Sequence, residues 1–154
     1  WLDAFFAAST WLGSIAVLLP ASLALAWWYR RRGDRVAPWL LPLAVGGAWL
    51  IVRVAKVVVA RPRPDLHEAL VALPGGLSFP SGHATQAAAF AVALALAPRE
   101  RPSPALVAAA ALAAIVVAVS RAWLQVHYPS DVVAGALAGA AWASGLCLLP
   151  GARR

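Results

Sequence analysis

The sequence predicts an all-α fold, a polytopic bundle of transmembrane helices. Of its 154 residues 62% are hydrophobic and only 12% are charged, whereas a soluble domain is about 45–50% apolar and about 25% charged. Apolar runs long enough to cross about 30 Å of hydrocarbon, each of about 20 residues, recur along most of the chain. A single membrane-embedded domain over residues 1–154 accommodates all of them.

Apolar length and flanking helix breakers place the individual spans. They predict five, at residues 10–29, 37–60, 81–97, 103–120 and 129–149. Tryptophans near the predicted span ends are interpreted as interfacial anchors; they are Trp11, Trp27, Trp28, Trp39 and Trp123. Cys147 is the only cysteine, which excludes an intramolecular disulfide and a cysteine-based metal site, so we expect it to serve packing.

The basic residues predict the orientation in the membrane. Alternation along five spans puts residues 30–35, 98–102 and 151–154 on one side, and these connections carry eight of the 13 Lys and Arg residues. The positive-inside rule makes that side cytoplasmic. The net charge of +7 could also suggest nucleic acid, but the basic residues stand at the ends of apolar runs, so no nucleic-acid partner is expected. We expect a protein of the bacterial inner (plasma) membrane, with residues 61–80 and 121–128 on the extracytoplasmic face.

Ionisable groups in or beside spans are costly and are therefore candidates for function. The first segment of this kind is Lys56 to Pro64, KVVVARPRP. Its two prolines break the helix just past Ala60, so the chain can turn and bring Arg63 back beside Lys56. A lysine point charge and a planar arginine fork together suit a phosphoryl group. Interfacial snorkelling is the interpretation favoured for Arg53 and Arg61.

The second segment, residues 79–85, reads FPSGHAT and predicts a helix start at Pro80 and Ser81. Free N–H groups at such a start, with the helix dipole, make an anion site, and Gly82 allows close backbone approach. His83 stands one step further, where it can donate a proton to an oxygen that leaves a bound phosphate. Taken alone, the string is equally typical of ordinary Ser-Gly capping.

The third segment, residues 120–131, reads SRAWLQVHYPSD and contains a candidate nucleophile. His127 and Asp131 are four residues apart, so a helical turn around Pro129 would let the carboxylate hold the imidazole N–H and orient the other nitrogen for attack. For this segment alone, helix capping by the same two residues is an equal alternative. Small residues continue the same helix face and predict a packing surface; they are Gly135, Gly139 and Ala143.

The other acidic and histidine residues do not predict a metal centre. Asp65, His67 and Glu68 are interpreted as solvated residues of the connection after Arg63. A hydrolytic zinc site normally takes three protein ligands plus water, and neither an HExxH motif nor a second carboxylate stands near the spans. We therefore expect metal-free covalent catalysis without a cofactor.

Taken together, the three segments resemble the signature of the type-2 phosphatidic-acid phosphatase superfamily, written K-x6-R-P, P-S-G-H and S-R-x5-H-x3-D. The motifs span residues 56–131, about half of the chain. Every specified residue is present: Lys56, Arg63, Pro64, Pro80, Ser81, Gly82, His83, Ser120, Arg121, His127 and Asp131.

The resemblance implies a catalytic mechanism and a role for each residue. His127 would attack phosphorus to form a phosphohistidine, Asp131 would orient and support it, and His83 would protonate the leaving group before water hydrolyses the intermediate. No metal is required in the family. The phosphate oxygens would be held, as expected for phosphoryl transfer, by Lys56, Arg63, Ser81, the Gly82 backbone and Arg121.

The number of spans departs from the family pattern. Integral-membrane members usually have a six-helix core, whereas this chain offers five apparent spans. We expect that the N-terminal helix is missing and that Trp1–Thr10 is the connection that normally follows it. A genuine non-spanning N-terminal segment is the alternative.

The expected function is hydrolysis of a membrane lipid phosphate or diphosphate: an isoprenoid diphosphate such as undecaprenyl diphosphate, phosphatidic acid, phosphatidylglycerol phosphate or a polyprenyl-phosphosugar. The related vanadium haloperoxidases are soluble, which the apolar spans argue against. A non-catalytic lipid-phosphate binding or transport protein is the second hypothesis. Ala, Val and Leu walls accept acyl and prenyl tails alike, and stripes of small residues serve within one chain or between chains, so both the lipid and the oligomeric state stay open.

Overall fold

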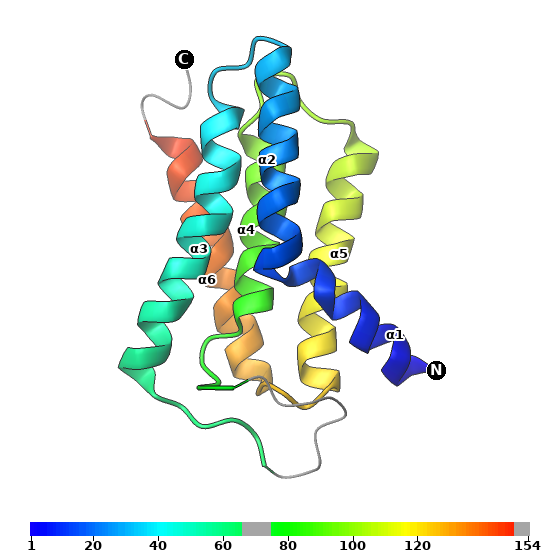
Figure 1. Ribbon diagram of the computed structural model, residues 1–154, viewed down its shortest axis with the longest axis vertical. Coiled ribbons are helices and arrows are strands. Elements are labelled where there is room, and N and C mark those ends of the chain that lie inside the picture. The colour runs from blue at the N-terminus through cyan, green and yellow to red at the C-terminus, as the bar shows by residue number, and fades with distance from the viewer. Residues whose placement is uncertain (66–74, 150–154) are drawn as a thin grey trace.

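The computed structural model describes residues 1–65 and 75–149, and all regular structure within them is helical (Figure 1). The helices follow the sequence in the order α1 (Leu2–Ser9), the short 3-10 helix η1 (Thr10–Gly13), α2 (Ile15–Arg31), α3 (Ala37–Val59), α4 (Gly82–Leu96), α5 (Pro104–Trp123) and α6 (Pro129–Leu148). The all-α bundle expected from the composition is therefore confirmed.

Helices α3, α5 and α6 are each long and apolar enough to cross a membrane. The segment Leu2–Gly13 and helix α2 qualify together as one broken span, bent by 49°. The span expected at residues 10–29 is therefore present as part of a longer, bent span, because the backbone of Ser14 is extended and separates η1 from α2. The apolar composition of a segment predicts the number of residues that can lie in lipid. It does not distinguish one straight helix from two helices joined at a bend.

Helix α4 is shorter than the span expected over residues 81–97. Its 15 residues reach about 22 Å at 1.5 Å per residue, less than the roughly 30 Å of a hydrocarbon core. It lies in the middle of the bundle and contacts α2, α3, α5 and α6 (Figure 1). The first residues of α4 are consequently enclosed by longer neighbours.

Helix α6 packs closely on α4 along its stripe of small residues, as the sequence predicts. A Cβ built on Gly139 would lie 2.0 Å from the carbonyl oxygen of Thr85, and one on Gly135 would lie 2.8 Å from that of Ser81. Only glycine permits backbones to approach to this distance. This contact fixes the start of α4 against the start of α6.

The connections 32–36 and 97–103 lie together at one end of the bundle, opposite the connections that carry the motifs (Figure 1). Asp34 joins the two: its carboxylate accepts from the backbone N–H of Val36 at 2.7 Å, of Ala37 at 3.1 Å and of Arg99 at 2.8 Å. The expected basic segment 151–154 lies outside the described residues. Cys147 is buried in the apolar core and unbridged, as expected.

The tryptophans interpreted as anchors have exposed rings. Their exposed fractions range from 40% for Trp28 to 68% for Trp39. Large apolar side chains on the outer faces of the helices are exposed as well, such as Val57 and Val58 of α3 at 77% each. An apolar exterior of this kind is typical of a lipid-facing surface.

Candidate active site

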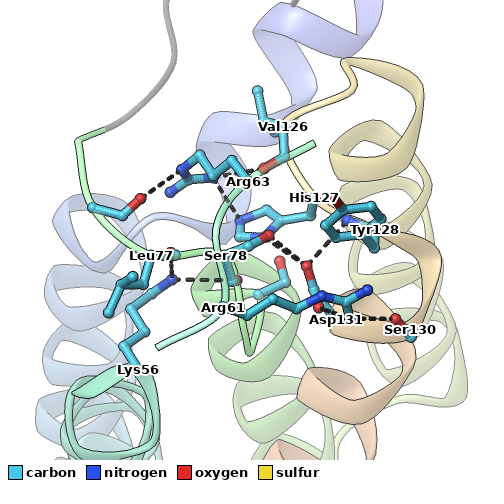
Figure 2. A network of polar contacts seen from close by, with 12 residues as sticks. Lys56, Arg61, Arg63, Leu77, Ser78, Val126, His127, Tyr128, Ser130 and Asp131 are labelled. Carbon is cyan, nitrogen blue, oxygen red and sulfur yellow. Dashed lines mark hydrogen bonds and ion pairs between the residues drawn. The ribbon is translucent and has the colours of Figure 1, made fainter. Parts of the chain in front are cut away.

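The three motif segments meet at the end of the bundle opposite Asp34 (Figure 2). Two backbone hydrogen bonds hold them together. The N–H of Ser78 donates to the carbonyl of Arg61 at 2.7 Å, and the N–H of Ser81 donates to the carbonyl of Asp131 at 3.0 Å. Residues up to 70 positions apart in sequence therefore share one site.

The chain reversal after α3 occurs as predicted. Ala60 ends the helix in the left-handed conformation, with φ of 50°, and the proline-rich segment that follows turns back toward the bundle. The Lys56 ammonium donates to the carbonyls of Leu77 and Ser78, the latter at 3.3 Å. Lys56 thereby connects the last turn of α3 to residues 77–78, which precede α4.

Arg63 lies over the candidate nucleophile (Figure 2). Its guanidinium donates to the carbonyl of Val126 at 2.6 Å and to that of Gly76 at 3.1 Å. One of its nitrogens, Nη1, is 3.4 Å from Nε2 of His127. The K-x6-R pair thus brings a cation next to the imidazole.

His127 is 4% exposed and lies in the connection between α5 and α6. Burial, and next to it the charge of Arg63, lowers the pKa of the imidazole, and Arg121 and Lys56 act in the same direction. The ring is consequently neutral at physiological pH, which leaves one nitrogen with a free electron pair.

Asp131 is fully buried and its carboxylate is multiply bonded. One oxygen, Oδ1, accepts from Arg61 at 2.9 Å. The other, Oδ2, accepts from the Ser78 hydroxyl at 2.5 Å and from the backbone N–H of Tyr128 at 3.1 Å. The direct bond expected between His127 and Asp131 is absent, because Nδ1 and Oδ2 are 3.7 Å apart. The chain before Pro129 is not helical, so the imidazole is offset from the carboxylate.

Ser81 and Arg121 each have a buried polar atom with no hydrogen-bond partner in the described residues, Oγ and Nε respectively. Ser81 occupies the N-cap position of α4, but its side chain makes no capping bond. Arg121 uses Nη1 to donate to the Thr10 hydroxyl at 2.7 Å. Among the described residues, Ser14 Oγ and Gln86 Oε1 are also buried and unpaired. Buried polar groups are nearly always paired, and Ser81 and Arg121 are the two motif residues of this set, so their free donors suit an anionic ligand at this end of the bundle.

The sequence interpretation missed three contributors to this end of the bundle. Arg61, expected at the membrane interface, instead bonds Asp131 and also donates to the Ser130 hydroxyl at 2.8 Å. Ser78 bonds Asp131, and Thr10 bonds Arg121. The contact of Arg61 is understood only from the fold, because the fully buried Asp131 carboxylate requires a counter-charge. No sequence pattern indicated a role for Ser78 or Thr10.

The Arg61 contact predicts a loss of activity on substitution. Arg61→Ala should lower catalytic turnover about tenfold, between the effects typical of exposed and buried ion pairs, because Asp131 loses its charged partner. Arg53→Ala is the matched control, since Arg53 is exposed and stacks on Trp49 at 4.9 Å. Steady-state rates at equal protein concentration test the pair. Equal rates for the two variants would contradict the assigned contact.

Among the described residues no group of three or more His, Cys, Asp or Glu side chains is arranged to hold a metal ion. Asp65 is exposed, as expected of a solvated residue. His67 and Glu68 lie outside the described residues. Metal independence stays a prediction that an assay must test.

Cations and unpaired donors gathered at one end of an apolar helical bundle suit an anionic ligand such as phosphate. Comparison with known proteins gives the family. A model of the PAP2 superfamily matches residues 37–154. The chain belongs to the PAP2 superfamily, as the three motifs indicate.

Relatives and a solved structure agree with this assignment. Phosphatidylglycerophosphatase B of Bacillus subtilis is 30% identical, over 88% of this chain and 68% of that protein. Decaprenylphosphoryl-5-phosphoribose phosphatase of Mycobacterium tuberculosis is 35% identical, over 84% and 67% respectively.

The crystal structure of a transmembrane PAP2-type phosphatidylglycerolphosphate phosphatase from Bacillus subtilis matches with a TM-score of 0.83 at 27% identity, over 100% of this chain and 79% of that one. The chain is thus an integral membrane protein, and the enzyme class expected from its motifs, a lipid phosphatase, is confirmed.

Proposed function

We propose that the protein hydrolyses a membrane lipid phosphate through a phosphohistidine on His127, without a metal ion. The observation that carries the proposal is the unpaired hydroxyl of Ser81. An N-cap serine normally accepts from its own helix, yet here the side chain makes no such bond and is fully buried. Ser14, the buried N-cap serine of α2, is unpaired in the same way. Ser81 differs because it lies where the three motif segments meet, and a phosphate oxygen at the N-terminus of α4 would pair its hydroxyl there.

The charges around this position support phosphate as the ligand. Lys56, Arg63 and Arg121 contribute positive charge, and Asp131, the carboxylate beside them, is already bonded by Arg61 and Ser78. With the Gly82 backbone N–H, the three cations and Ser81 form the proposed phosphate cradle. Donors fixed before the substrate arrives stabilise the charge of the phosphoryl transition state.

The chemical steps follow from the neutral imidazole of His127. Its free electron pair forms a bond to phosphorus while the bond to the lipid oxygen breaks, and that oxygen takes a proton from the protonated imidazole of His83. Water then attacks phosphorus and gives a proton to His83 while the phosphorus–nitrogen bond breaks, so inorganic phosphate leaves and both imidazoles are restored. His83 is suited to the proton transfer by its place one residue after Gly82 in the cradle.

The substrate class is supported by the relatives. One is named a phosphatidylglycerophosphatase and another a decaprenylphosphoryl-5-phosphoribose phosphatase, so we propose a lipid with a terminal phosphomonoester ahead of a diphosphate. The basic connection at residues 30–35, which lies at the opposite end from the cradle, supports a site on the extracytoplasmic face of the bacterial inner membrane.

Phosphate release by the purified protein tests the function. In detergent micelles containing EDTA, we expect release from phosphatidylglycerol phosphate, phosphatidic acid and a polyprenyl-phosphosugar, and slower release from undecaprenyl diphosphate. A mock purification from cells lacking the gene gives the background. Loss of activity on chelation that added metal restores would overturn metal independence. Lipid-phosphate flux in liposomes without any hydrolysis would establish the transport alternative instead.

A further inference from the structure

We propose that Ser78 is a positioning residue that connects His127 to Asp131 and selects the ring nitrogen that attacks phosphorus. The inference rests on the proposed function and adds a residue that lies outside the three motifs. It depends on the hydrogen-bonding capacity of three side chains that meet at one point (Figure 2).

Ser78 lies between the imidazole and the carboxylate. Its side chain is fully buried, and its hydroxyl oxygen is 2.5 Å from Oδ2 of Asp131 and 3.3 Å from Nδ1 of His127. A hydroxyl has one hydrogen to donate. An ionised carboxylate only accepts, so that hydrogen goes to Asp131, and Ser78 can only accept from His127. The nitrogen Nδ1 therefore carries the ring proton.

The other ring nitrogen gives the same answer independently. Nε2 of His127 lies 3.4 Å from Nη1 of Arg63. A guanidinium has no acceptor, so a nitrogen that faces it is favoured as the one with the free electron pair. Both neighbours thus favour a proton on Nδ1 and an electron pair on Nε2. Nε2 is then the nucleophilic atom.

The hydroxyl also provides the path by which Asp131 supports the reaction. When Nε2 bonds to phosphorus, the ring becomes positively charged while its proton stays on Nδ1. The carboxylate is 3.7 Å from that nitrogen, too far for a direct hydrogen bond. Ser78 accepts a hydrogen bond from Nδ1 and donates one to Asp131. The negative carboxylate polarises the hydroxyl, and the hydroxyl oxygen in turn stabilises the positive charge on the ring.

Removal of the hydroxyl alone isolates this role. The backbone of Ser78 bonds Arg61 and Lys56 through its N–H and carbonyl, and Ser78→Ala leaves those bonds in place. We expect kcat to fall about 10- to 100-fold, as when a group that orients a metal-bound histidine is lost, with KM changed less than about threefold. Ser78→Thr retains a hydroxyl and should recover most of kcat.

A second buried serine provides the matched control. Ser22 of α2 is also fully buried, and its hydroxyl donates within its own helix to the carbonyl of Leu19 at 2.7 Å. Ser22→Ala should keep wild-type kcat. An equal loss in Ser22→Ala and Ser78→Ala would mean that removing any buried hydroxyl has this effect, and it would overturn the assignment.

The double variant distinguishes a relay from general packing. If Ser78 acts through Asp131, then Ser78→Ala combined with Asp131→Asn should be little slower than Asp131→Asn alone. Multiplication of the two losses would contradict the relay. Wild-type kcat in Ser78→Ala, with His127→Ala inactive, would overturn the inference and leave the proposed function standing. Full activity in His127→Ala would overturn the function itself.

A measurement on the unsubstituted protein completes the test in case a variant fails to fold. Nitrogen-15 NMR of histidine-labelled protein distinguishes protonated from unprotonated ring nitrogens, and the His127 signals are those lost in His127→Asn. We expect Nδ1 protonated and Nε2 unprotonated at neutral pH. The opposite tautomer would overturn the proposal.

Discussion

His127→Ala is expected to lower phosphate release from lipid phosphates by about 10⁴-fold or more, the scale seen when an enzyme loses its covalent nucleophile. The imidazole is neutral and faces Arg63. Among the described residues no other histidine ring lies against Arg63, so no second side chain can replace the nucleophile. The comparison is made on kcat in detergent at matched protein concentration. His127→Asn serves as a second variant, because it fills part of the space left by a ring that is 4% exposed.

The intermediate itself can be detected in the same preparation. Rapid quenching after mixing with a phosphate-labelled lipid should trap label on the wild-type protein and none on His127→Ala. A phosphorus–nitrogen bond is cleaved by acid and survives base, which separates it from a serine ester. Label retained by the variant, or turnover within tenfold of wild type with normal thermal stability, would contradict the assignment of the nucleophile.

Gly139→Ala is expected to produce the largest loss of stability. The added Cβ would lie 2.0 Å from the Thr85 carbonyl oxygen and 2.9 Å from its carbon. These are backbone atoms, so α6 must move away from α4, and overpacking of this kind typically costs about 1–3 kcal/mol. Because Ser81 and Asp131 stand at the starts of the two helices, phosphatase activity should fall together with the melting temperature.

Gly145→Ala is the control for this substitution. It lies on the same helix, and a Cβ there would meet nothing within 4 Å, so neither the melting temperature in detergent nor the activity should decrease. A wild-type melting temperature for Gly139→Ala would show that the two helices pack less closely than the structure indicates.

Much of the fold was predictable because membrane helices leave a strong composition signal. The five apolar runs correspond to α2 through α6, and the stripe through Gly135 and Gly139 does pack on a neighbour. The bend at Ser14 was not predictable, because hydropathy reports preference for lipid and carries no information on helix direction. The length of α4 was overestimated, because apolar residues continue beyond the ends of the helix.

The residues proposed for catalysis were predictable from the sequence only where they belong to the three motifs. Motif spacing brought Lys56, Arg63 and His127 together in sequence reasoning, and the structure places them together. Arg61 and Ser78 were missed because their partner Asp131 is 70 and 53 positions away in the chain. Such pairs exist only once the chain has folded, and a serine or arginine in a connection carries no local signature of a distant carboxylate.

The bond between Thr10 and Arg121 links the N-terminal segment to the motif end of the bundle. Thr10 precedes residues 37–154, the part of the chain that the family model recognises, yet its hydroxyl holds the guanidinium of a motif arginine at 2.7 Å. The orientation of Arg121 therefore depends on a residue outside the three motifs. A substitution that removes the Thr10 hydroxyl changes how this guanidinium is held while every motif residue stays in place.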